Sequence, residues 1–109
     1  MITLITLHIV NPENREKALW LLTENTRLAR KAKGFISRKI FFSRKDPNKG
    51  YSLTSWETEA DMDRFLKSPE RPPLDHEGPE KRVYLNDPSE RVLLFSSTDS
   101  DRYELVPVP

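Results

Sequence analysis

The stretch Tyr51–Ser68, YSLTSWETEADMDRFLKS, decides the fold that the sequence predicts. Its first residues alternate between two faces and predict a short strand that ends at Trp56. A helix is expected to begin directly afterwards, because Thr58 can cap its first turn and Asp61 follows three residues later. Apolar residues then recur with helical spacing at Met62, Phe65 and Leu66. Pro69 ends the helix, since the residue before a proline is driven out of helical angles.

A longer strand–helix unit precedes this one. Residues 2–10 are rich in aliphatic and β-branched residues and predict a strand that is largely apolar on both faces, so both faces should be covered. One face would carry Ile5, Leu7 and Ile9, and the other would carry Ile2, Leu4, Thr6, His8 and Val10. The Asn11-Pro12 pair then predicts a helix from Pro12 to about Lys33, with Gly34 as its stop.

A hairpin connects the two units. Residues 35–43 predict a strand with Ile36, Ile40 and Phe42 on one face and Phe35 and Phe41 on the other. The polar residues 44–50 predict the turn, and the strand that ends at Trp56 follows it. The order of elements is β-α-β-β-α, and one further strand completes the ferredoxin-like α+β arrangement β-α-β-β-α-β.

The chain from about residue 69 onward predicts a loop-rich C-terminal extension. Residues 69–79 are rich in proline and charge and predict an extended loop. Three short apolar runs follow, at Val83–Leu85, Val92–Phe95 and Tyr103–Val108. We expect strands at the second and third runs, with a turn at residues 98–101 between them. Pro107 and Pro109 suggest a sheet edge or a strand that crosses to a partner chain.

Composition indicates one domain over residues 1–109 and excludes several classes of function. The chain has no cysteine, and its formal net charge of +1 selects no nucleic acid, membrane or acidic partner. No glycine-rich phosphate loop is present, and no histidine or cysteine spacing completes a metal site. The apolar start is too short to span a membrane, so we expect a cytoplasmic protein.

Several junctions resemble the antibiotic biosynthesis monooxygenase family of small dimeric α/β barrels. The resemblance is carried by Val10-Asn11-Pro12, by Lys33-Gly34-Phe35, and by residues 55–60 leading to Phe65 and Ser68. It implies a ferredoxin-like protomer that forms a homodimer through its sheet, often with strand exchange. It also implies a small-molecule pocket between each sheet and its own helices.

Two active branches of that family can be compared with this sequence. The haem-degrading branch uses an asparagine in the first strand, a tryptophan in the second helix and a histidine after that helix. The matching positions here are Thr6, Phe65 and His76. The quinone-forming branch needs no cofactor and uses a tryptophan at the end of the third strand, an asparagine four residues before it and a tyrosine six after it. The matching positions here are Trp56, Ser52 and Met62.

The resemblance implies, first, a small dimeric monooxygenase that oxidises a small aromatic substrate without a cofactor. His8 would remove a proton from the substrate, and the resulting carbanion would activate oxygen itself. Thr6 would hydrogen-bond the substrate, while Trp56 and Phe65 would shape the cavity. Trp20 could cover the mouth of the pocket, or it could lie in the core or in a dimer interface.

Two alternatives stay open at this point. His76 could bind haem iron in a haem-binding or haem-degrading protein, or it could be an ordinary polar loop residue. His8 and Trp56 could likewise be a satisfied buried histidine and a core anchor. The chain would then be a non-catalytic ligand-binding or interaction module whose pocket is closed by bulky side chains.

Overall fold

Six antiparallel strands form one sheet in the computed structural model, which describes residues 1–108. The sheet order is β2-β3-β1-β6-β5-β4. Along the chain, the elements are β1 (Ile2–Val10), a short 3-10 turn η1 (Pro12–Asn14), α1 (Arg15–Lys31), β2 (Phe35–Phe42), β3 (Lys49–Trp56), α2 (Glu59–Leu66), β4 (Leu74–Glu77), β5 (Arg82–Asn86) and β6 (Arg91–Glu104). The strands β2-β3-β1-β6 with α1 and α2 make up the predicted ferredoxin-like α+β fold, and β4 and β5 extend it.

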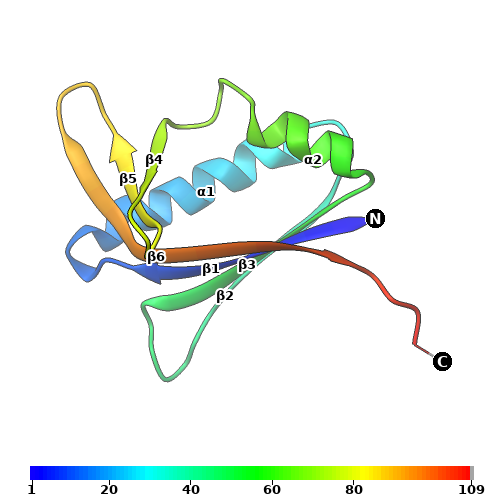
Figure 1. Ribbon diagram of the computed structural model, residues 1–109, viewed down its shortest axis with the longest axis horizontal. Coiled ribbons are helices and arrows are strands. Elements are labelled where there is room, and N and C mark those ends of the chain that lie inside the picture. The colour runs from blue at the N-terminus through cyan, green and yellow to red at the C-terminus, as the bar shows by residue number, and fades with distance from the viewer. Residues whose placement is uncertain (109) are drawn as a thin grey trace.

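Both helices cover the same face of the sheet (Figure 1). We call this the inner face, and the opposite, uncovered side the outer face. At one end, β4, β5 and the first part of β6 curve toward the helix side and close the space beside α1 (Figure 1). Neither α1 nor α2 has the length and apolar character needed to cross a bilayer.

The start of α1 follows the predicted signals, and its end differs slightly. The side chain of Asn11 accepts a hydrogen bond from the backbone N–H of Glu13 and caps η1. The regular helix ends at Lys31, two residues before the predicted end. Gly34 has a φ of +84° and lies in the turn beyond the helix, where a side chain would be strained.

The predicted cap of α2 is confirmed. Thr58 Oγ1 accepts a hydrogen bond from the backbone N–H of Asp61 at 3.1 Å. Asp61 also lies against Gly34, and a Cβ at that glycine would come within 2.2 Å of the Asp61 carboxylate. The turn after α1 and the first turn of α2 are therefore fitted to each other.

A bulge at the start of β2 changes which of its side chains face the helices. The register shifts between Phe35 and Ser37, so that one extra residue is inserted into β2. Phe35 consequently packs against the core, whereas Ile36 is exposed. The predicted grouping of Ile36 with Ile40 and Phe42 is therefore wrong, because sequence alternation alone does not reveal an inserted residue.

The C-terminal part contains more strand than the sequence predicts. β4 forms within the predicted extended loop, and β5 forms around Val83–Leu85, where no strand is predicted. β6 runs unbroken through residues 98–101 in place of the predicted turn. It does so because this segment pairs with β1 along its length, and ladder pairing outweighs the local turn preference of short polar residues. The strand predicted at Tyr103–Val108 ends at Glu104.

The core is divided into two apolar clusters under α1. The first joins α1 to the C-terminal strands through Val10, Ala18, Leu21, Leu22, Val83, Val92, Leu94 and Phe95. The second joins α1 to α2 through Ile2, Leu28, Ala29, Trp56, Met62 and Phe65. Side chains of both clusters also line the cavity described below, so the two clusters form its apolar walls.

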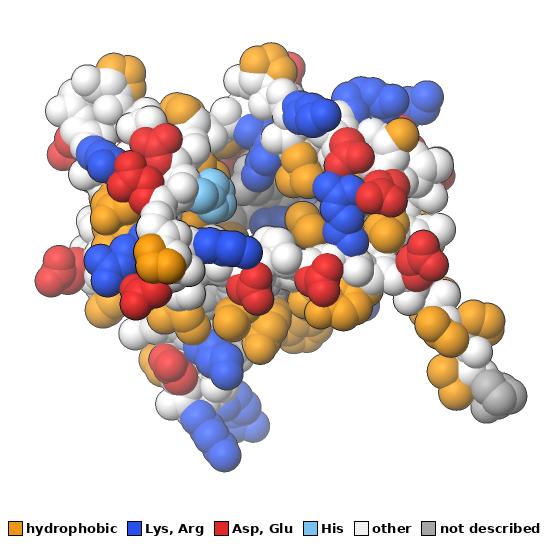
Figure 2. All heavy atoms as spheres, in the orientation of Figure 1, with side chains coloured by type: hydrophobic (Ala, Val, Ile, Leu, Met, Phe, Trp, Pro, Cys, Tyr) orange, Lys and Arg blue, Asp and Glu red, His pale blue; other side chains and the backbone are white. Residues whose placement is uncertain are grey.

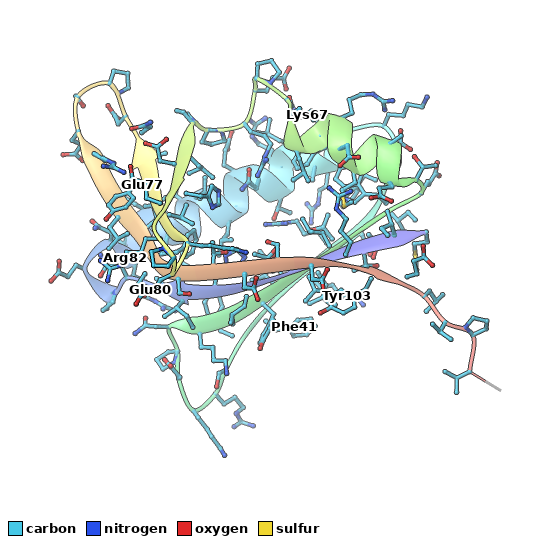
Figure 3. The ribbon with its side chains drawn as sticks, in the orientation of Figure 1. Phe41, Lys67, Glu77, Glu80, Arg82 and Tyr103 are labelled. Carbon is cyan, nitrogen blue, oxygen red and sulfur yellow. The ribbon has the colours of Figure 1, made fainter. Side chains whose placement is uncertain are left out.

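The outer face of the sheet carries apolar side chains that no part of residues 1–108 covers. Phe41 and Tyr103 lie on the side away from the helices (Figure 3). The register places Ile5, Leu7, Tyr51 and Leu53 on the same face. Phe41 is 55% exposed and Tyr103 is 48% exposed. Among the described residues, β6 beyond Phe95 pairs with β1 alone, so its second edge is open.

Candidate functional site

A strip of small polar side chains crosses the inner face at the middle of the sheet. These residues are buried, and they come from three neighbouring strands: Thr6 and His8 from β1, Ser52 and Thr54 from β3, and Thr98 from β6. An inner face packed by helices normally carries apolar side chains, because burying polar groups costs free energy. We call this set the polar strip, and it forms the floor of a cavity.

The cavity lies between the polar strip and the helices and has a volume of about 470 Å³. This volume falls within the range of roughly 300–1,000 Å³ that is usual for small-molecule sites. Figure 2 shows the corresponding hollow in the surface, with lysine or arginine side chains around and inside it. Its apolar walls come from both core clusters and include Leu21, Leu22, Trp56, Phe65 and Phe95.

Five of the six residues predicted for a site line this cavity: Thr6, His8, Trp56, Phe65 and His76. His76 belongs to β4 rather than to a loop. Trp20 lies outside the cavity. It is 50% exposed on α1 and borders a separate hollow beside Pro69–Pro73 and Leu85–Pro88. Trp20 therefore contributes neither to the cavity wall nor to a fully buried core.

His8 is held in the polar strip by one hydrogen bond. Its Nε2 lies 3.0 Å from Ser52 Oγ, and its ring packs against Phe95 with a centroid distance of 4.9 Å. Nδ1 is buried and has no hydrogen-bond partner among the described residues. Burial, and secondly the positive charge of Arg38, lower the pKa of His8 from 6.5 to about 4. The imidazole is therefore neutral at neutral pH.

Two arginines also line the cavity. Arg38 of β2 donates from Nε to Thr26 Oγ1 at 2.9 Å and from Nη1 to Thr54 Oγ1 at 2.7 Å. Arg71, which follows α2, donates from Nη1 to the Leu66 carbonyl at 3.0 Å. Burial lowers the pKa of both side chains, that of Arg38 to about 10. Arginine side chains in proteins are not deprotonated at neutral pH, so both carry a positive charge.

The hydrogen-bonding capacity of the cavity is incompletely used. The buried side-chain atoms that lack a partner among the described residues are His8 Nδ1, Asn25 Oδ1 and Arg71 Nε. All three belong to residues that line the cavity. Buried polar atoms are rarely left unpaired in folded proteins. Their convergence on one cavity indicates a site for a polar ligand or for ordered water.

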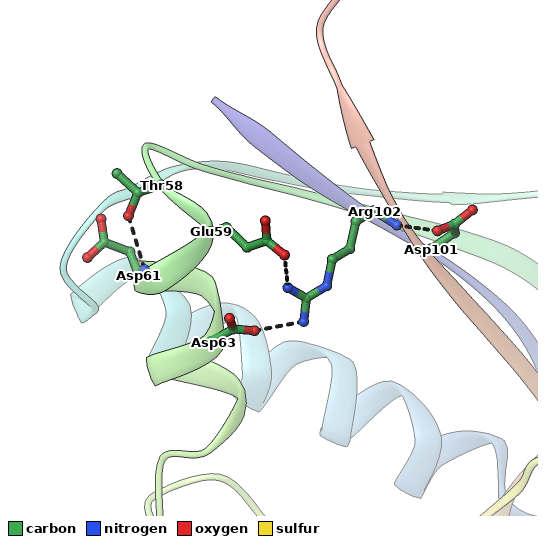
Figure 4. Close-up of polar contacts among 6 residues, drawn as sticks. All are labelled: Thr58, Glu59, Asp61, Asp63, Asp101 and Arg102. Atoms are coloured by element: carbon green, nitrogen blue, oxygen red, sulfur yellow. Dashed lines mark hydrogen bonds and ion pairs between the residues drawn. The ribbon is translucent and has the colours of Figure 1, made fainter.

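A cluster of ion pairs connects the far part of β6 to α2 at the edge of the cavity. Arg102 donates from Nη1 to Glu59 at 2.5 Å and from Nη2 to Asp63 at 2.7 Å, as Figure 4 shows. The hydrogen bond to Asp63, followed by that to Glu59, raises the pKa of Arg102. These contacts are exposed and contribute little to stability, but they fix the position of β6 beside α2.

Several polar residues of the cavity are not predicted for a site from the sequence, among them Asn25, Arg38 and Arg71. Two of them carried a usable signal. Asn25 interrupts the apolar stripe of α1, and Arg38 occupies a position on β2 whose neighbours on the same face, Ile40 and Phe42, are apolar. A polar residue at a position that periodicity assigns to the core is a signal for a site. The loop position of Arg71 gives no comparable signal.

The family model for antibiotic biosynthesis monooxygenases matches residues 1–71. The chain belongs to this family. The match covers β1 to α2 and ends before β4, so three of the strands lie outside it. A search of the curated proteins finds no match.

Several solved structures share the fold of this chain. A crystal structure of an antibiotic biosynthesis monooxygenase has a TM-score of 0.70 at 15% identity and covers 98% of this chain and 100% of its own. A conserved protein from Methanosarcina mazei Go1 has a TM-score of 0.68 at 20% identity, covering 94% of this chain and 89% of its own. SnoaB, a cofactor-independent oxygenase from Streptomyces nogalater, has a TM-score of 0.69 at 10% identity, covering 98% of this chain and 94% of its own. At these identities, the likeness concerns the fold alone.

Proposed function

We propose that this protein is a cofactor-independent monooxygenase that oxidises a small aromatic substrate in the cavity on the polar strip. The observation that carries the proposal is a neutral, buried histidine with an unpartnered ring nitrogen in a cavity that has aromatic walls. Membership of the family supports an oxygenase, and SnoaB, which has a similar fold, is a cofactor-independent one. Trp56 and Phe65, whose ring centroids are 5.1 Å apart, pack together in the apolar wall of the cavity.

His8 is the general base in this proposal. If Nε2–H donates to Ser52 Oγ, then Nδ1 carries the free lone pair and can accept a proton from a carbon next to a carbonyl group. The low pKa of His8 keeps the ring unprotonated and ready for this step, although it also makes the ring a weak base. Positive charge from Arg38 offsets that weakness, because it stabilises the carbanion that the proton transfer creates.

The oxidation itself needs no group from the protein. The carbanion transfers one electron to O₂, and recombination of the two radicals forms a carbon–oxygen bond. Protonation gives a hydroperoxide, and loss of water from it leaves a new carbonyl group. A ring CH₂ and O₂ thus become a ring C=O and H₂O. The role of the cavity is to hold the substrate, accept the first proton and exclude bulk water.

Oxygen uptake with a hydroxyanthrone-type substrate tests this proposal. We expect His8→Ala to lower kcat by about 100-fold or more, which is the usual contribution of a general base. The exposed helix variant Thr23→Ala should retain full activity. Because the pKa of His8 is about 4, the rate should be constant from pH 8 to 6 and should fall only as the pH approaches that value. Equal rates in wild type and His8→Ala would remove His8 from the mechanism.

Haem binding is the second candidate, because His76 lines the same cavity. Burial, and secondly the charge of Arg71, lower the pKa of His76, which favours the neutral imidazole that an iron ligand requires. His76 would hold the iron, and the haem would supply oxygen activation. Haem titration distinguishes the candidates: a Soret shift that disappears in His76→Ala supports haem binding, and the same shift in that variant contradicts it.

We further propose that the protein is a homodimer that pairs the outer faces of two sheets. The apolar outer-face residues support this, since contiguous exposed apolar patches mark interaction surfaces. Residues 105–108 extend away from the sheet with exposed Leu105, Val106 and Val108, in a position to reach a second chain (Figure 1). Light scattering coupled to size-exclusion chromatography tests this proposal, and a stable monomer at micromolar concentration would contradict it.

A further inference from the structure

The cavity has an unbalanced positive charge. Four charged side chains line it: Arg38, Arg71, Asp101 and Arg102. The two histidines that also line it, His8 and His76, are neutral. Arg102 is neutralised by its ion pairs with Glu59 and Asp63. Asp101 is exposed and accepts a hydrogen bond from the backbone N–H of Arg102. Neither Arg38 nor Arg71 forms an ion pair with a carboxylate among residues 1–108, so both charges remain uncompensated.

Two uncompensated arginines beside one cavity cost free energy in the absence of a ligand. A partly buried charge without a counter-ion is destabilising, and these two side chains also repel each other, since the charge of Arg71 lowers the pKa of Arg38. The hydroxyl groups of Thr26 and Thr54 orient Arg38 without neutralising it. An arrangement of this kind is typical of sites that receive their negative charge from a ligand.

Arg71 presents a free pair of donors. Its Nη1 bonds the Leu66 carbonyl, and its guanidinium lies over the Phe65 ring at 5.3 Å from the centroid, which fixes its plane. Nε is buried without a partner, and no hydrogen bond from Nη2 occurs among the described residues. Nε–H and Nη2–H form the side of a guanidinium that matches the two oxygens of a carboxylate.

We infer that the cavity binds a planar aromatic carboxylate, with the carboxylate held by Arg38 and Arg71 and the rings lying against Trp56 and Phe65. The inference rests on the proposed function and narrows it to an anionic substrate class. The anion supplies the missing counter-charge and the acceptor for Arg71 Nε. The aromatic walls supply the apolar contact that orients the rings toward His8.

A matched pair of probes tests the inference: anthracene-2-carboxylate and the neutral, nearly isosteric anthracene-2-carboxamide. Both are fluorescent, so their binding to the purified protein can be measured by titration without turnover. We expect the carboxylate to bind at least about tenfold more tightly than the carboxamide, since hydrogen bonds between charged groups are worth about 1.4 kcal/mol or more. Equal affinities, or no carboxylate binding at millimolar concentration, would overturn the inference.

Substitutions at the two arginines test whether they cause the tighter binding of the carboxylate. Arg38→Leu and Arg71→Leu should each abolish most of the preference for the carboxylate while leaving carboxamide binding in place, which also shows that the variants are folded. Arg71→Lys keeps the charge but loses the paired donors, so an intermediate preference is expected. Arg44→Leu removes one exposed positive charge from the hairpin and should leave the preference unchanged. A preference that survives both leucine variants would contradict the inference.

The binding experiment is independent of catalysis. If no oxygen uptake is found but the carboxylate still binds more tightly than the carboxamide, the proposed monooxygenase activity is rejected and the anion site is retained. If oxygen uptake is found but the carboxylate is not preferred, the activity is retained and the anion site is rejected. Haem also carries carboxylates that these arginines could bind, and the His76→Ala titration described above identifies that case.

Discussion

The two faces of the central strands reverse the usual pattern of a sheet covered on one side. The inner face, under the helices, carries the polar strip of Thr6, His8, Ser52, Thr54 and Thr98. The outer face, which residues 1–108 leave uncovered, carries apolar side chains such as Ile5, Leu7 and Phe41. An antiparallel sheet normally places its apolar side chains under the helices. The reversal supports both proposals made above, a ligand site on the inner face and a dimer interface on the outer face.

The largest effect is expected from a charge at the centre of the outer face. Leu7→Asp would place a carboxylate in the proposed dimer interface, where burying it without a partner costs several kcal/mol. We expect dimer affinity to fall by about 100-fold or more, which sedimentation velocity can measure. Thr23→Asp introduces the same group on the exposed side of α1 and should leave the dimer intact. An unchanged dimer in Leu7→Asp would place the interface elsewhere.

The second largest effect is expected from acid, which should lower the free energy of unfolding through His8 on the inner face. The pKa of His8 is about 4 in the folded chain and 6.5 in the unfolded chain. The unfolded chain therefore takes up a proton first as the pH falls, so the stability from this residue is complete above pH 6.5 and is lost on the way to pH 4. The loss should be roughly 3 kcal/mol, at about 1.4 kcal/mol per pKa unit.

Urea unfolding at a series of pH values measures that loss. His8→Gln should remove most of the pH dependence in this window, while His76→Gln controls for the second histidine, whose pKa is also lowered. An identical pH dependence in wild type and His8→Gln would show that His8 is not the residue responsible.

The smallest effect is expected from a pair of hydroxyl groups on the inner face. Thr6 Oγ1 and Ser100 Oγ share a hydrogen bond at 3.0 Å on the inner face. Replacing both partners by apolar groups of similar shape, in the double variant Thr6→Val with Ser100→Ala, should change the free energy of unfolding by less than about 1 kcal/mol. Ligand binding or turnover should fall nonetheless, if Thr6 contacts the substrate. A loss of several kcal/mol in thermal or urea unfolding would instead give the polar strip a structural role.

The first two thirds of the fold could be predicted because its signals are local. The Thr58 cap, the aliphatic and β-branched run of β1 and the hairpin at residues 44–50 each depend on neighbouring residues. The bulge in β2 and the unbroken course of β6 could not be predicted, since both depend on pairing with strands distant in sequence. Local composition favours a turn at residues 98–101, but these residues form a strand because they pair with β1.

The site was predicted in part for the same reason. His8 and Thr6 can be recognised as polar residues on an otherwise apolar strand face. Trp56 can be recognised because it ends a predicted strand directly before a predicted helix. Arg71 lines the cavity only because of the path that the chain takes after α2, and sequence periodicity does not predict that path. Trp20 lies outside the cavity, and its place in an apolar helical turn gave no direction toward one particular cavity.

The open edge of β6 affects how this protein behaves in concentrated solution. Unpaired strand edges recruit further strands and so nucleate aggregates. Here the exposed segment carries Asp99, Asp101 and Glu104, whose like charges repel the edge of a neighbouring molecule. Replacing these carboxylates with neutral residues would remove that repulsion, and we expect such a variant to aggregate along this strand at lower protein concentration.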